Sequence, residues 1–104
     1  MAYDLAILDA AGKPFRYASI GVEEHFRLVS MAKEKGFSLL SRMEDYYEDA
    51  TYDPTEMNAL KKELALILAD INPEETGIRT FLIEAINLAD EAMARQKGLE
   101  GIAD

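Results

Sequence analysis

The sequence of 104 residues contains no cysteine, and this absence removes several kinds of chemistry. Without a thiol there can be no disulfide framework, no thiolate metal site and no cysteine nucleophile. A chain of this length does not need such cross-links, because one domain of about a hundred residues can bury an adequate core. We therefore expect a single domain over residues 1–104, and the lack of cysteine fits a reducing cytosol.

A basic leader and a long hydrophobic run are also missing. The N-terminus, MAYDLAILDAAGKPF, carries acidic residues where a signal peptide needs basic ones. No segment approaches the roughly 18 consecutive apolar residues of a membrane-spanning helix. The sequence therefore predicts a cytoplasmic protein with no membrane partner.

Basic residues are scarce, because 11 lysines and arginines stand against 20 aspartates and glutamates, for a formal net charge of −9. The acidic excess is concentrated in residues 43–56, MEDYYEDATYDPTE, which hold six carboxylates and no basic residue. Nucleic acid would be repelled by such a chain, as would an anionic membrane. Unless the charge serves only solubility, the composition favours a basic protein partner.

Sequence motifs for catalysis and for cofactors are absent as well. There is no phosphate-binding loop, dinucleotide fingerprint or zinc-ligand spacing. A calcium loop needs a central glycine and alternating oxygen ligands, and residues 45–56 provide neither. His25 is the only histidine and lies between Glu24 and Phe26 in a helical pattern, which favours a structural role at the helix surface or half-buried. We predict no catalytic residue, no metal, no cofactor and no enzymatic activity.

The sequence does contain clear hydrophobic periodicity. Residues 3–9, YDLAILD, alternate with a period of two, and residues 15–20, FRYASI, alternate again after the turn-forming stretch AAGKP. This pattern predicts a β-hairpin over residues 3–20. Because an isolated two-stranded sheet is marginally stable in water, we expect the first helix to cover it.

Four helices are expected to follow the hairpin, over residues 22–35, 39–49, 54–71 and 78–97. The first has acidic residues in its first turn and lysines in its last, with Gly36 beyond its end. The third begins at Asp53-Pro54-Thr55-Glu56, which combines a capping box with proline at the first helical position. Residues 37–40 could instead form a third short strand, and residues 99–104 read as a frayed tail. The predicted fold class is α+β.

The second expected helix carries most of the acidic stretch. A helix over residues 39–49 turns Tyr46 and Tyr47 inward and places four carboxylates together on its outer face. Like charges at positions i and i+4 disfavour that helix by about 0.2–0.5 kcal/mol for each pair. Such clustering against local stability favours a functional surface, and Tyr52 in the following loop adds an aromatic residue typical of interfaces. The predicted partner-binding residues are Glu44, Asp45, Glu48, Asp49, Tyr46 and Tyr52.

In its length, its lack of cysteine and its adjacent Tyr46 and Tyr47 among four carboxylates, the chain resembles the small acidic bacterial immunity proteins. These include the proteins paired with contact-dependent growth-inhibition toxins. The resemblance implies a non-enzymatic inhibitor that occludes the active or substrate-binding site of a toxin domain, often a nuclease. Glu44, Asp45, Glu48, Asp49 and Tyr52 would then face a basic toxin cleft. The alternative is a structural or regulatory domain that self-associates through the apolar face of residues 78–93.

Overall fold

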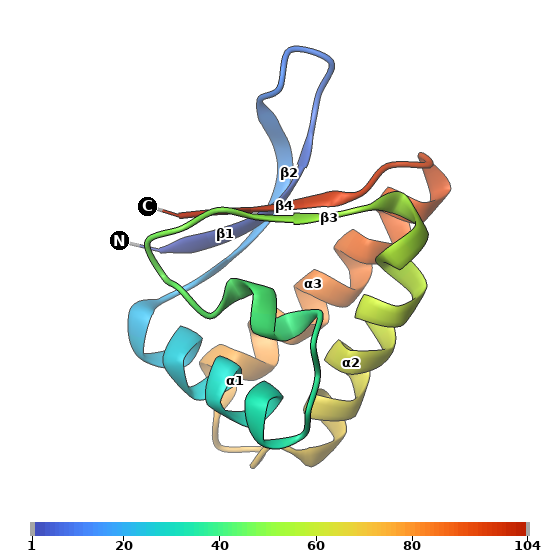
Figure 1. The fold of residues 1–104 in the computed structure, drawn as a ribbon. Helices are drawn as coiled ribbons and strands as arrows, with labels where there is room; N and C mark the ends of the chain where they lie inside the picture. The colour runs from blue at the N-terminus through green and yellow to red at the C-terminus, as the bar shows by residue number, and fades with distance from the viewer. Residues whose placement is uncertain (1, 104) are drawn as a thin grey trace.

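The structure is a computed structural model that describes residues 2–103, and its fold class is α+β, as predicted. One antiparallel sheet of four strands, in the order β2-β1-β4-β3, lies above three α-helices (Figure 1). The elements in chain order are β1 (Tyr3–Leu8), β2 (Pro14–Ile20), α1 (Val22–Glu34), the 3₁₀ helix η1 (Leu40–Met43), β3 (Ala50–Tyr52), the 3₁₀ helix η2 (Pro54–Glu56), α2 (Met57–Asp70), α3 (Thr76–Ala94) and β4 (Leu99–Ile102).

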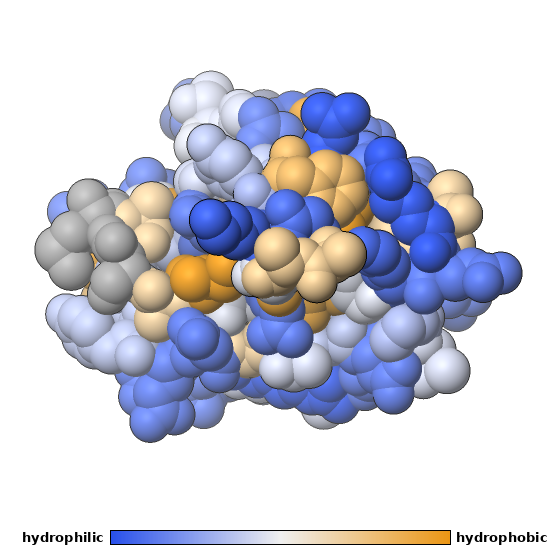
Figure 2. All heavy atoms as spheres, turned by 90° about the horizontal axis from the view of Figure 1, so that it is seen from above, coloured by the Kyte–Doolittle hydropathy of each residue, from blue (hydrophilic) through white to orange (hydrophobic). Residues whose placement is uncertain are grey.

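The predicted N-terminal hairpin is confirmed. Strands β1 and β2 pair in antiparallel register from Tyr3 opposite Ile20 to Ile7 opposite Arg16. Gly12 has the positive φ of +78° that the turn requires, and the turn projects beyond the rest of the molecule (Figure 1). The helix that packs most extensively on the hairpin is α3, however, and not the first helix as expected. From the side of the sheet, hydrophilic residues surround small, separate hydrophobic areas (Figure 2).

The prediction of a frayed tail is wrong, because its first residues form strand β4. This strand lies between β1 and β3, with Leu5 and Ala50 both opposite Gly101. Gly101 is needed there, because a Cβ atom on it would lie only 2.5 Å from the Tyr3 hydroxyl. Four residues with a central glycine give a weak local signal for a strand, and the two neighbouring strands supply its backbone hydrogen bonds.

The predicted helix over residues 39–49 is also wrong. Only the short helix η1 forms, and a turn then leads into β3, so the third strand is not residues 37–40. The side chain of Asp45 accepts a hydrogen bond from the backbone N–H of Tyr47 at 2.8 Å, a local bond that competes with helix formation. Glu63 of α2 accepts a bond from the N–H of Leu40 at 2.9 Å, so a distant element positions the start of η1.

The ends of the other helices follow local signals closely. Helix α1 ends before Gly36, whose φ of +71° lets the N–H of Phe37 donate to the carbonyl of Ala32 at 2.8 Å. The capping box of Asp53 and Glu56 is present, although it opens η2 and α2 begins at Met57. Helix α3 begins at Thr76 and ends at Ala94, slightly earlier at both ends than predicted.

The apolar face of α3 belongs to the core of the molecule. Seven residues of this helix are buried, and they pack with the inner face of the sheet and with α2. Ile83 is the one large hydrophobic residue of α3 that is substantially exposed in the described chain. Most of the broad apolar face of residues 78–93 therefore lies in the core. No helix within residues 2–103 is long and apolar enough to cross a membrane.

Candidate functional site

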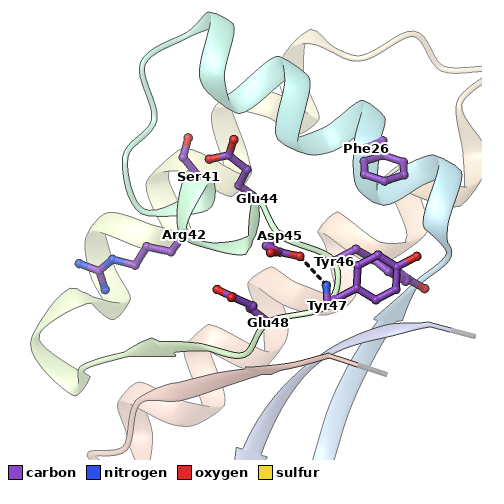
Figure 3. A pocket seen from close by; sticks show the side chains of 8 residues that line it. All are labelled: Phe26, Ser41, Arg42, Glu44, Asp45, Tyr46, Tyr47 and Glu48. Carbon is purple, nitrogen blue, oxygen red and sulfur yellow. Dashed lines mark hydrogen bonds between the residues drawn. The ribbon is translucent and has the colours of Figure 1, made fainter.

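The residues that connect η1 to β3 form one wall of a hollow of about 560 Å³ at the surface (Figure 3). We call residues 44–49 the acidic segment and this feature the acidic hollow. Helix α1 contributes Phe26 to the lining of the hollow, and η1 contributes Ser41 and Arg42. The residues that line the hollow are Phe26, Ser41, Arg42, Glu44, Asp45, Tyr46, Tyr47 and Glu48.

All four carboxylates predicted for partner binding are exposed, and the structure brings three of them to the acidic hollow. Glu44 forms an ion pair with Lys33 of α1, and both side chains are about half exposed, so this pair contributes little stability. Asp49 does not line the hollow, because it turns toward β4 and accepts a bond from the N–H of Ala103 at 2.8 Å. Among the described residues, the Glu48 carboxylate has no hydrogen-bond or ion-pair partner.

The structure reverses the expected burial of Tyr47 and Tyr52, whereas Tyr46 points inward as the helical pattern predicted. Tyr52, predicted to face the partner, is 1% exposed, and its hydroxyl donates to the carbonyl of Leu39 at 2.7 Å. Burial raises the pKa of Tyr52 above its ordinary value. Tyr46 is 2% exposed and lies in the core, whereas Tyr47 is 70% exposed although a helix would have turned it inward. A turn points neighbouring side chains in different directions, and this separates Tyr46 from Tyr47.

Sequence reasoning missed Phe26, which lines the acidic hollow and is 56% exposed. Its ring centroid lies 6.3 Å from that of Tyr46, and the Tyr46 ring in turn meets Tyr47 edge-on at 5.6 Å. The inward stripe of α1 runs through His25, Leu28, Val29 and Ala32. These residues follow the helical spacing i, i+3, i+4 and i+7, so this pattern could have shown that Phe26 points outward.

Arg42 lines the acidic hollow but does not neutralise its carboxylates. Its guanidinium is held by both carboxylate oxygens of Glu56, one of them at 2.8 Å, and it donates to the carbonyl of Thr51 at 3.1 Å. This bidentate contact lowers the pKa of Glu56 to about 2. The guanidinium extends away from the aromatic side chains in Figure 3. The hollow therefore keeps the negative charge of Asp45 and Glu48.

His25 lies beneath the acidic segment in a cluster of aromatic rings. It is fully buried, and its ring centroid is 5.1 Å from that of Tyr3 and 5.0 Å from that of Tyr46. Its Nε2 lies 2.5 Å from the carbonyl oxygen of Met43, which can only accept, so Nε2 carries the proton. The other nitrogen, Nδ1, has no hydrogen-bond partner among the described residues. Burial lowers the pKa of His25, which keeps the ring neutral.

The described residues, 2–103, contain no group of three or more histidine, aspartate or glutamate side chains placed to hold a metal ion. Comparisons of the chain with protein-family models, with curated proteins and with solved structures found no match. The arrangement of exposed carboxylates around two exposed aromatic rings is thus the observation that bears most directly on function.

Proposed function

We propose that this protein is a non-enzymatic binding protein that docks a basic segment of another protein in the acidic hollow. One observation carries the proposal: Tyr47 and Phe26 expose most of their rings beside the carboxylates of Asp45 and Glu48. Lysine and arginine side chains combine an apolar stem with a cationic head. The rings of the hollow would pack against such a stem, and the carboxylates would pair with the head.

The carboxylates and the aromatic rings have different roles in this proposal. Exposed charges mainly raise the rate of encounter with a partner of opposite charge, and salt screens their effect. Exposed aromatic side chains supply contact area at low conformational entropy cost. We therefore assign steering to Glu44, Asp45 and Glu48, and anchoring to Tyr47 and Phe26.

We further propose that the partner is a basic toxin domain, such as a nuclease, whose active or substrate-binding site the acidic segment occludes. The resemblance to small acidic immunity proteins and the charge of the hollow both support this assignment. An acidic surface that fills a cleft built for a nucleic acid substrate would exclude that substrate, because the surface and the substrate both carry negative charge. Self-association through α3 has less support, because its apolar face is already buried in the core.

The test is binding to the basic domain of a secreted toxin encoded beside the gene of this chain, measured by titration calorimetry. The double variant Asp45→Asn, Glu48→Gln removes two charges from the hollow, and Asn keeps an oxygen that accepts from the N–H of Tyr47. We expect a loss of affinity of at least tenfold for this variant.

The matched control is the double variant Glu74→Gln, Glu84→Gln, which removes the same charge from exposed side chains outside the hollow. It should bind within about twofold of the wild-type chain. Equal losses for the two double variants would show that net charge, and not the acidic hollow, sets the affinity. The absence of any toxin domain that binds would reject the toxin assignment itself.

A further inference from the structure

His25 of helix α1 contacts the residues where η1 ends and the acidic segment begins. Its Nε2–H donates to the carbonyl of Met43, the last residue of η1, and Glu44 follows at once. The Tyr46 ring from the acidic segment packs edge-on against the imidazole at an interplanar angle of 73°. Neutral His25 therefore contacts Met43, the residue just before the acidic segment, and Tyr46 within it. These two contacts hold the segment that lines the acidic hollow.

A second proton on His25 would disrupt this arrangement. Nδ1 would become a donor, and no acceptor lies within reach of it among the described residues. A buried donor without an acceptor is destabilising, and a buried charge without a counter-charge is more so. Water would supply these missing contacts, and movement of the acidic segment away from α1 would admit it, because Tyr46 of that segment covers the imidazole.

The titratable groups around His25 do not neutralise the positive charge that the protonated ring would carry. Asp45 of the acidic segment favours the protonated ring, but this influence is smaller than the opposing effect of burial. Tyr3 of β1 is neutral at physiological pH, because burial and nearby carboxylates raise its pKa to about 12. Glu24, next to His25 on α1, places its carboxylate beside Gly21 and Gly77 instead.

We propose that His25 is a pH-sensitive switch that holds the acidic segment in place when neutral and releases it when protonated. Release dismantles the acidic hollow, because the segment supplies most of its lining residues. The switch itself is a property of the free chain. Its consequence, the loss of a bound basic partner at mildly acidic pH, rests on the proposed function.

The direction of the effect follows from proton linkage. We call the state with the acidic segment in place closed, and the state with the segment moved away released. The pKa of His25 is lowered in the closed state, so the released state binds a proton more readily. The closed state is therefore fully stable above the ordinary pKa of 6.5 and loses stability as the pH falls through and below that value. Between pH 7.5 and pH 5.5 the opening equilibrium increases by at most about tenfold, a limit set by the ordinary pKa of the released ring. His25 is the only histidine of the sequence, and histidine is the side chain whose ordinary pKa lies in this pH range.

The test is hydrogen exchange of the free protein at pH 7.5 and 5.5, corrected for intrinsic exchange rates. We expect protection of the amides of residues 43–52 to fall severalfold, up to about tenfold, at pH 5.5, while the amides of α3 keep theirs. Nitrogen NMR of the single histidine should show the neutral Nε2–H tautomer at pH 7.5. Unchanged protection of residues 43–52 at the lower pH would overturn the proposal.

Two variants separate His25 from the carboxylates. His25→Gln keeps an N–H donor without a titratable ring, and His25→Phe removes both the donor and the titration. Protection of residues 43–52 should change less than twofold between the two pH values in both variants, even if His25→Phe is less protected throughout. A comparable fall in the variants would assign the effect to other groups and overturn the switch. Because no ligand is present, these results are independent of whether the hollow binds a basic partner.

Discussion

At the scale of single residues, the acidic stretch divides into side chains that build the fold and side chains that are free to bind. Tyr46, Tyr52 and His25 are buried, whereas Tyr47 and the four carboxylates of the acidic segment are exposed. Sequence reasoning found the exposed carboxylates because charge is a property of each residue. It assigned Tyr47 wrongly because the direction of that side chain depends on the backbone turn, which the helical pattern did not predict. It assigned Tyr52 wrongly because this residue lies in strand β3 and not in a loop.

Tyr52 and Tyr47 therefore make opposite predictions for the same substitution. Tyr52→Phe removes the donor to the buried carbonyl of Leu39, and we expect it to lower the free energy of unfolding by about 1–3 kcal/mol. Tyr47→Phe removes a hydroxyl from an exposed ring and should change stability by less than about 0.5 kcal/mol. Urea denaturation of the two variants measures both effects. Equal destabilisation by the two substitutions would contradict the assigned positions.

At the scale of secondary-structure elements, local signals were sufficient where a few neighbouring residues determine the structure. The period of two in β1 and β2, the capping box at Asp53 and the glycine after α1 all predicted their elements correctly. Strand β4 and the acidic segment could not be predicted in this way. Strand β4 depends on pairing with β1 and β3, and the turn depends on contacts with Glu63 and His25, which lie on other helices.

The end of α3 offers a prediction at this scale. Gln96 has a positive φ of 57°, which allows the N–H of Lys97 to donate to the carbonyl of Ala92 at 2.8 Å. Helix α1 has the same end with Gly36 in the equivalent position. Because left-handed backbone is strained for residues with a Cβ, Gln96→Gly should raise stability by about 0.5–1 kcal/mol, after allowance for the backbone entropy of glycine.

Gly36→Ala is the matched reciprocal change, and it should lower stability by about 1 kcal/mol because alanine is strained at that φ. Thermal unfolding of both variants at one pH compares the two helix ends directly. A lower unfolding temperature for Gln96→Gly than for the wild-type chain would show that the side chain of Gln96 contributes contacts that outweigh the strain.

At the scale of the whole molecule, the net charge of −9 leaves two ways to attract a basic partner. The charge could act diffusely over the entire surface, or the acidic hollow could concentrate the contact where carboxylates and exposed rings meet. We expect the second, contact concentrated at the acidic hollow. The apolar face of α3, which the sequence predicted as an alternative interface, lies in the core and offers no comparable site.

The most direct measurement is NMR mapping of a deca-arginine peptide titrated into the isotope-labelled protein at physiological ionic strength. We expect the shift changes to concentrate on the acidic segment and on Phe26 of α1, and we expect the variant Asp45→Asn, Glu48→Gln to abolish them. Small changes spread over all acidic parts of the chain, including α3, and unaltered in that variant, would contradict the claim.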